Sequence, residues 1–215
     1  MKKTSAAKNG NPAKEFSRED RLHESFNELW NNSLKTHGED YYSKLTVDDF
    51  ISLKGAISCV NNIITLKTTV AFIDYLHKNG LITDLQAEKM KAQVMATNVN
   101  TNGFDIDTKG NTPNIIAEVK CNIPVNKHSF GADQIKGIIN DLNGLADGKS
   151  KSKTKVKDCF KFMVLLKVNA VEESMKKVVD AYNKEGPIPV KEYKKGDKPL
   201  SKDCIYVVYI DSDKI

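Results

Sequence analysis

Hydrophobic residues recur at helical spacing through the N-terminal half of the chain. In residues 18–35, the large apolar side chains Leu22, Phe26, Leu29 and Trp30 are three or four positions apart. That spacing places them on one face of a helix. The pattern therefore predicts a first amphipathic helix over this segment.

The next apolar segment, residues 46–80, begins with a plausible N-cap at Thr46 and ends at a terminating Gly80. At 35 residues it is long for one globular helix, so we expect two helices with a break within Gly55–Asn62. A further helix is predicted over Asp84–Ala96.

The period then changes. Residues 102–108 and 114–121 resemble two short strands, and the turn residues Gly110, Asn111 and Pro113 lie between them. A short connection of this kind favours antiparallel pairing. The sequence predicts a β-hairpin here.

Helices and strands alternate through the rest of the chain. Residues 129–148 carry an apolar helical stripe, and residues 170–186 are again helical in pattern. Residues 159–168 and 204–210 are nearly continuous apolar runs of strand length, as expected of strands covered on both faces. The order predicts an α/β fold with a mixed β-sheet flanked by helices and an N-terminal helical region.

Composition narrows the class of protein. With 215 residues and 40% hydrophobic residues, the chain suits one substantial core. It shows no secretory signal and no apolar run of bilayer length, so we expect a cytoplasmic protein without membrane contact. Its four cysteines are scattered without a CxxC pair, which favours reduced thiols.

The net charge of +5 is concentrated in lysine-rich stretches. Such stretches are either solvated loops or contacts for nucleic-acid phosphates, and charge alone does not choose between them. They occupy residues 8–14, 147–158 and 191–199.

Charged residues interrupt both strands of the predicted hairpin. Strand alternation puts Asp105 and Asp107 on one face of the first strand, opposite Phe104 and Ile106. Carboxylates in apolar segments require a partner, because an unpaired buried charge is costly.

In the second strand, Ile116, Glu118 and Lys120 share a face, so the hairpin can gather carboxylates and an ammonium. Hard divalent cations bind through one or two carboxylates plus water and substrate phosphate. A nearby lysine can orient water or steady charge on a phosphate. The set therefore indicates metal-assisted phosphodiester hydrolysis.

This arrangement resembles the PD-(D/E)XK nuclease superfamily, which includes many type II restriction endonucleases, junction resolvases and repair nucleases. Phe104–Asp105 stands where that group has Pro-Asp, and Glu118–Lys120 supplies its Glu-x-Lys. The resemblance covers residues 84–168 and implies a restriction endonuclease-like core of a helix, three strands, a helix and a strand.

The resemblance also implies roles for individual residues. Asp105 and Glu118 would bind Mg²⁺ with the backbone carbonyl of Val119, while Lys120 would activate or position the attacking water. Because Asp107 shares the face of Asp105, the first metal ligand stays open between them. The further candidates near the site are Asp107, Gln134 and Glu88.

The resulting expectation is a magnesium-dependent endonuclease acting on double-stranded DNA, of type II restriction character, that forms a homodimer. A repair or junction-resolving nuclease of the same fold is one alternative, and a non-catalytic DNA-binding module is another. The expected parts are a flexible tail (1–15), a helical region for DNA recognition or dimerisation packed on the core (16–83), and a nuclease core (84–215).

Overall fold

The computed structural model separates the chain into two compact units, residues 1–56 and 57–215, rather than dividing it before residue 84. The expected tail (1–15) and the centre of the hairpin turn lie outside the described residues. The structure describes residues 17–97, 103–108, 113–124, 129–150, 152–194, 196 and 200–215.

The first unit contains helix α1 (Arg18–Leu34), the short helix η1 (Tyr42–Lys44) and the beginning of helix α2 (Val47–Lys78). The predicted helix over 18–35 is confirmed. It starts where the Ser17 side chain accepts a 3.1 Å hydrogen bond from the Asp20 backbone N–H, which satisfies one of the free donors of the first turn.

A group of half-buried aromatic side chains, rather than the whole predicted apolar face, holds α1 to the rest of this unit. Phe26 lies 5.9 Å from Trp30 and 5.2 Å from Phe50, measured between ring centroids. Leu22 and Leu29 remain 54% and 66% exposed. The helix therefore leaves half of its apolar face in solvent.

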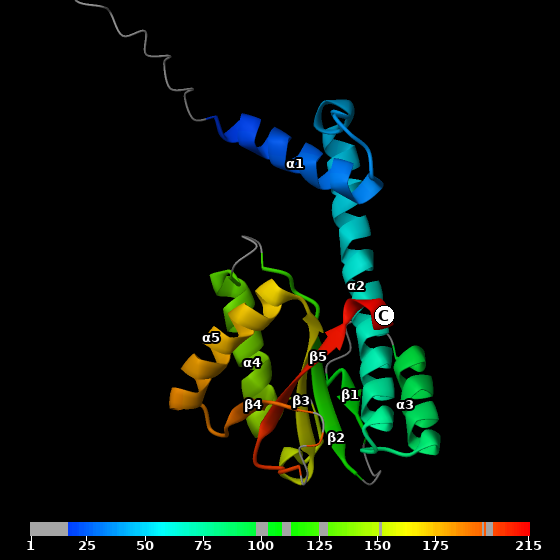
Figure 1. Ribbon diagram of the computed structural model, residues 1–215, viewed down its shortest axis with the longest axis vertical. Helices are drawn as coiled ribbons and strands as arrows, with labels where there is room; N and C mark the ends of the chain where they lie inside the picture. Colours follow the sequence, from blue (N-terminus) through cyan, green and yellow to red (C-terminus); the bar gives the residue numbers. More distant parts are fainter. Residues whose placement is uncertain are drawn as a thin grey trace, which may run out of the picture. The chain divides into compact units, whose positions relative to one another are not determined.

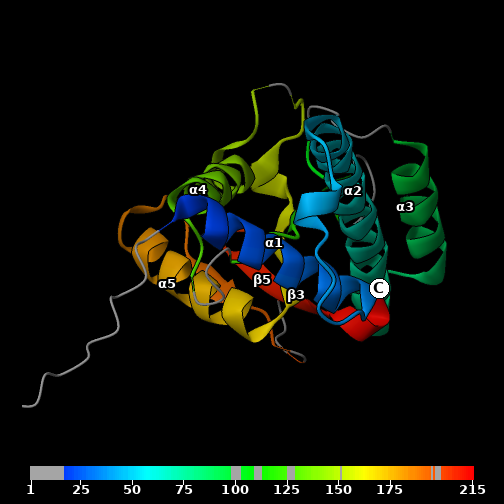
Figure 2. The ribbon, with the colours of Figure 1, turned by 90° about the horizontal axis from the view of Figure 1, so that it is seen from above.

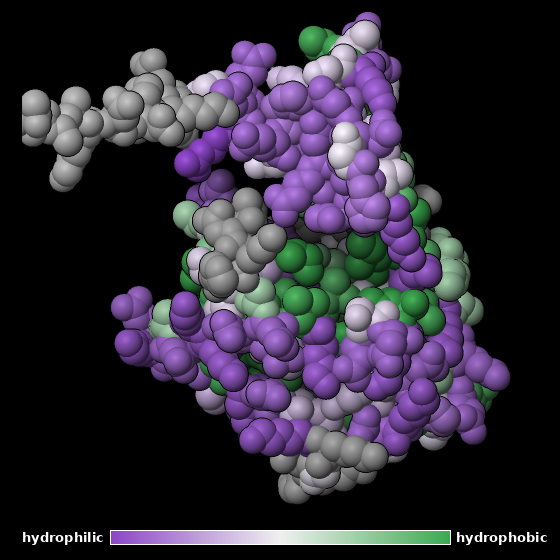
Figure 3. All heavy atoms as spheres, turned by 45° about the horizontal axis from the view of Figure 1, so that its top comes forward, coloured by the Kyte–Doolittle hydropathy of each residue, from purple (hydrophilic) through white to green (hydrophobic). Residues whose placement is uncertain are grey.

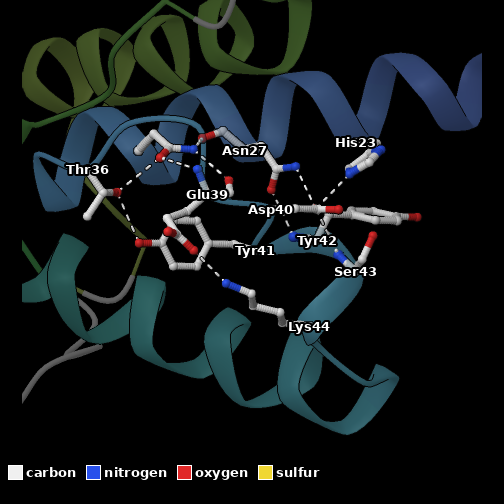
Figure 4. Close-up of polar contacts among 10 residues, drawn as sticks. His23, Asn27, Thr36, Glu39, Asp40, Tyr41, Tyr42, Ser43 and Lys44 are labelled. Atoms are coloured by element: carbon white, nitrogen blue, oxygen red, sulfur yellow. Dashed lines mark hydrogen bonds and ion pairs between the residues drawn. The ribbon is translucent and has the colours of Figure 1, made fainter.

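Asp40 organises the loop between α1 and α2 (Figure 4). Its Oδ1 lies 2.7 Å from His23 Nε2, accepts a 2.8 Å hydrogen bond from Asn27 Nδ2, and accepts another from the Ser43 backbone N–H at 3.2 Å. Asn27 also accepts from the Tyr42 backbone N–H at 2.8 Å. These hydrogen bonds, led by that of Asn27, hold the pKa of Asp40 well below its usual value.

The predicted break in the second helical segment is wrong, because α2 continues without interruption for 32 residues. A single glycine such as Gly55 costs a helix only about 1 kcal/mol, and no proline is present to stop it. By length and composition, α2 is the one described helix that could cross a membrane, although a single such helix is weak evidence of a span.

The second unit is built on a mixed five-stranded sheet with strand order β1-β2-β3-β5-β4 (Figure 1). β1 pairs antiparallel with β2, as predicted, and the remaining neighbours are parallel. The strands are β1 (Ile106–Asp107), β2 (Ile115–Lys120), β3 (Phe160–Lys167), β4 (Val190–Glu192) and β5 (Ile205–Asp211).

Helices cover both faces of this sheet. The C-terminal part of α2 and α3 (Asp84–Ala96) lie on one side, and α4 (Ala132–Asp147) and α5 (Asn169–Glu185) lie on the other (Figure 2). The central strands β3 and β5 are buried on both faces, which explains their continuous apolar sequences. The predicted α/β class and flanked mixed sheet are confirmed.

Apolar contacts assign each face of β2 to one core. Ile115, Ala117 and Val119 belong to the cluster formed with α2 and α3, whereas Ile116 belongs to the cluster formed with α4 and α5. Glu118 and Lys120 alternate with the first set and therefore lie on the α4 side.

The beginning of the hairpin departs from the predicted alternation. Phe104 and Ile106 pack in different core clusters, because β1 begins only at Ile106 and Asp105 lies in a bend before it. Two strands, rather than the three implied by the resemblance, lie among the described residues between α3 and α4.

β4 was not expected. Its residues Lys191 and Glu192 fall in a lysine-rich stretch for which the sequence predicted no strand, yet β4 pairs with β5 at the sheet edge. Edge strands tolerate charged side chains because one side of the strand faces solvent.

In the view of Figure 3 the surface is mainly hydrophilic, and some hydrophobic residues are exposed on it. The exposed apolar side chains of the second unit include Ile57, Val60 and Ile63 of α2.

We predict that Asp40→Ala loosens the first unit, because it removes the acceptor shared by His23, Asn27 and Ser43. Trp30 is the single tryptophan of the chain and lies in this unit, so its fluorescence reports local melting. The variant should melt at lower temperature than wild type at neutral pH. Because the folded pKa of Asp40 is depressed, the difference should shrink as pH falls below the ordinary value of 3.8.

The control is Glu24→Ala, which removes an exposed carboxyl of α1, the helix that carries His23 and Asn27. Equal melting of the Asp40 and Glu24 variants at neutral pH would contradict a structural role for the Asp40 network.

Candidate functional site

The antiparallel hairpin brings Asp105 against the second strand. Ile106 pairs with Ala117, so the bend before β1 lies beside the C-terminal half of β2. Asp105 Oδ2 accepts a 2.7 Å hydrogen bond from the Val119 backbone N–H. The carboxylate is thereby fixed next to the residue that follows Glu118.

Glu118 and Lys120 lie on the α4 face of β2, and each forms an ion pair. Glu118 is 4% exposed, and its Oε1 lies 2.6 Å from Lys149 Nζ. Lys120 Nζ lies 2.6 Å from Asp141 Oδ2. Lys149 is also 4.0 Å from Asp141 Oδ1, so the two pairs form one network.

We refer to Asp105, Glu118, Lys120, Asp141 and Lys149 as the hairpin cluster. Three carboxyl groups face two ammonium groups, so the fully ionised cluster carries one net negative charge. Such an imbalance in a largely buried group favours an additional cation.

The sequence did not identify Asp141 and Lys149 as members of the hairpin cluster. Only Asp141 occupies a position in the sequence pattern that could have indicated it. Asp141 lies three residues after Ile138 and four before Leu145, so it occupies the buried face of α4. A carboxylate at that position signals a buried partner. Lys149 stands in a lysine-rich stretch and is indistinguishable there from Lys153, which is exposed.

The stretch is therefore not uniformly a solvated loop. The Lys149 side chain is only 27% exposed and points into the hairpin cluster. Among the residues of this stretch that the structure describes, Lys153, Lys155 and Lys157 are exposed.

Burial dominates the acid–base properties of the two hairpin carboxyls. It raises the pKa of Glu118 to about 8, with a further contribution from the charge of Asp105 and an opposing one from Lys149. Partial desolvation of its carboxyl group also raises the pKa of Asp105, against the lowering effect of the Val119 N–H hydrogen bond, although Asp105 as a residue is exposed. Ionising both groups without an added cation is costly.

Lys120 is stabilised in its charged form. Burial acts to lower the pKa of Lys120, but the hydrogen bond and charge of Asp141, together with the charge of Glu118, raise it above its usual value. Lys120 is therefore held as an ammonium by α4.

The remaining predicted residues lie elsewhere. Asp107 Oδ2 accepts a 2.5 Å hydrogen bond from Thr154 Oγ1, away from the ion pairs of the cluster. Gln134 Oε1 accepts a 2.9 Å hydrogen bond from the Gly131 backbone N–H, and its Nε2 donates to the Ile123 carbonyl at 3.0 Å, so Gln134 orders the start of α4. Glu88 is exposed on α3.

The hairpin cluster suits a hard divalent cation by its donor chemistry. Asp105 and Glu118 offer carboxylate oxygens. The charge of Lys149 lowers the pKa of Glu118 by less than burial raises it, so a further cation would stabilise the ionised carboxylate. No set of three or more His, Cys, Asp or Glu side chains is arranged to hold a metal among the residues described. Two carboxylates supplemented by water remain a normal ligand set for Mg²⁺.

Comparisons with protein families, curated proteins and solved structures found no match to this chain.

We predict that Glu118→Gln changes the pH dependence of stability in metal-free protein. The pKa of Glu118 is raised from its ordinary value of 4.5 to about 8 in the folded protein. Protonated Glu118 therefore contributes fully to the free energy of unfolding below pH 4.5, and this contribution is lost as pH rises through about 8. In EDTA, wild type should lose stability relative to the variant from about pH 5 to about pH 8, by at most about 1.4 kcal/mol per pH unit. Urea denaturation at several pH values measures this.

Glu173→Gln is the matched control, because Glu173 is exposed on α5. Parallel stability profiles for wild type and Glu118→Gln would contradict the raised pKa of Glu118.

Proposed function

We propose that the protein is a magnesium-dependent endonuclease that hydrolyses phosphodiester bonds of double-stranded DNA, of type II restriction character and with a restriction endonuclease-like core. The supporting observation is the convergence of Asp105, Glu118 and Lys120, in which the carboxylate of Asp105 bonds to the backbone beside Glu118. Phosphodiester hydrolysis needs cation-binding oxygens and a positive side chain within one small site.

In this proposal, Asp105, Glu118 and the Val119 carbonyl bind Mg²⁺. The ion would polarise the phosphodiester and lower the pKa of a bound water. Lys120 orients the attacking water or stabilises phosphate charge. Asp141 positions Lys120 through their 2.6 Å ion pair, which keeps the ammonium on the same side of β2 as Glu118.

Exposed lysines support nucleic acid as the substrate. The chain has a net charge of +5, and Lys153, Lys155 and Lys157 are exposed in the segment that follows Lys149 along the chain. Lysines at such positions neutralise backbone phosphates and add affinity that does not depend on base sequence.

We also propose a homodimer, because two-fold symmetry suits paired cleavage of a duplex. The first unit exposes apolar side chains that a protein or DNA partner could cover, including Leu22, Leu29 and Ile51. This supports an interaction role for the N-terminal helices, in DNA recognition or dimerisation.

We predict that wild-type protein cleaves mixed-sequence duplex DNA with Mg²⁺ and not in EDTA. Asp105→Asn, Glu118→Gln and Lys120→Met should each lower the cleavage rate by about 100-fold or more, the scale expected for loss of a group that stabilises transition-state charge. Gel analysis with sequencing of the fragment ends measures both rate and site.

Asp107→Asn is the matched control, since Asp107 bonds to Thr154 instead of entering the ion-pair network. It should retain cleavage within about threefold of wild type, because asparagine keeps an oxygen that can accept from Thr154 and the change leaves the ion pairs of the hairpin cluster intact. Cleavage of branched DNA alone would favour a junction-resolving nuclease. DNA binding without metal-dependent cleavage of any DNA tested would contradict the enzymatic proposal.

A further inference from the structure

The ammonium of Lys149 is enclosed by groups from separate segments of the second unit. Its Nζ lies 2.6 Å from Glu118 Oε1 and donates a 2.8 Å hydrogen bond to the Gly103 carbonyl. It also lies 5.4 Å from the centroid of the Phe104 ring, within the range of a cation–π contact. The surroundings form a cation site and not a loose surface contact.

The backbone after α4 delivers Lys149 to this position. Gly148 caps α4 with a φ of +98°, a conformation that favours glycine, and its N–H donates to the Gly144 carbonyl at 2.9 Å. A Cβ at Gly144 would stand 3.2 Å from Lys149 Cγ and 3.3 Å from Lys149 Cε. Because Gly144 has no side chain, the aliphatic part of the Lys149 side chain can pack against α4 at this residue.

The atoms around the ammonium resemble the ligands of a hard metal ion. One carboxylate oxygen comes from Glu118 and one carbonyl oxygen from Gly103, and the charge of Lys149 also acts on Asp105. Oxygen atoms of these two kinds are the ligands that Mg²⁺ and Ca²⁺ use. Lys149 therefore contacts the same Glu118 carboxyl group that the proposed metal would require.

We propose that Lys149 is the resident cation of the metal-free site, and that its ammonium must leave Glu118 when a divalent ion binds there. This inference rests on the proposed function, because it takes Asp105 and Glu118 as the metal-binding carboxylates. A lysine is suited to such an exchange: its long stem can carry the charged group into solvent, and its side chain is already 27% exposed.

Competition between the two cations sets the apparent metal affinity. Metal binds only to molecules in which Lys149 has withdrawn from Glu118. The apparent dissociation constant for the metal therefore equals the intrinsic one divided by the fraction of molecules in that withdrawn state. Lys149 in this way keeps the buried carboxylate paired in the empty protein and raises the metal concentration needed to fill the site.

The test is calorimetric titration of the full chain with Mn²⁺ alone, without DNA, for wild type and Lys149→Met. Methionine keeps an unbranched apolar stem and removes the charge. We expect Mn²⁺ to bind the variant on the order of tenfold more tightly. A change of this size results when Lys149 has withdrawn from Glu118 in about a tenth of wild-type molecules. A lysine that only supports the fold or the metal ligands would leave the affinity unchanged or weaken it on removal.

Lys177→Met is the matched control, since it removes the same charge from an exposed position on α5 and should bind Mn²⁺ as wild type does. Gly144→Ala provides a second variant that retains the Lys149 charge but crowds its stem, and it should also tighten binding. This second variant keeps the test decisive if Lys149→Met fails to fold.

Adding Glu118→Gln separates the possible failures. If wild type and Lys149→Met bind Mn²⁺ equally and binding requires Glu118, the resident-cation inference is overturned while the proposed metal centre stands. If neither protein shows binding that depends on Glu118, the metal centre itself is overturned, and the inference falls with it.

Discussion

Burial of the Glu118 carboxyl beside Asp105 is the constraint on which the hairpin cluster depends. Glu118 lies in a strand that is covered on both faces, where an uncompensated carboxylate would be excluded. Lys149 supplies one positive charge at 2.6 Å, and Asp141 connects it with Lys120. The ion pairs explain how β2 carries two charged residues without losing its place in the sheet.

The rest of the second unit serves to position these groups. The parallel pairing of β2 with β3 fixes the strand in the sheet, and the β1 pairing places Asp105 beside Val119. Apolar packing of α4 through Leu142 and Leu145 sets the neighbouring Asp141 over Lys120. A cluster of opposed charges on one face of β2 is thus obtained from ordinary core packing together with one short hairpin.

Periodicity predicted the elements that are long and strongly patterned. β3, β5, α4 and α5 follow from continuous or helical apolar spacing, and the hairpin follows from the turn residues around Pro113. Two elements did not follow in the same way. A helix break was predicted near Gly55, but α2 continues through this residue. The charged residue Lys191 did not indicate a strand, yet it lies in the edge strand β4, which pairs with β5.

Strand alternation placed Glu118 and Lys120 together, but it could not show which groups from outside the hairpin would meet them. Asp141 depends on the position of α4 over the sheet, and Lys149 on a turn at Gly148 that redirects the chain. The bend before Ile106 likewise breaks the alternation and separates Asp105 from Asp107. These are tertiary effects, for which a single sequence holds little local signal.

The proposed divalent-metal site of Asp105 and Glu118, in which Lys149 stays bonded to Glu118 while the metal is absent, is open to a direct structural test. Anomalous diffraction from crystals soaked with Mn²⁺ tests it most directly, because it locates the ion and the lysine together. We predict an anomalous peak between the carboxylates of Asp105 and Glu118, with the Lys149 ammonium withdrawn from Glu118. Full binding of Mn²⁺ elsewhere, with Lys149 still paired to Glu118, would contradict it.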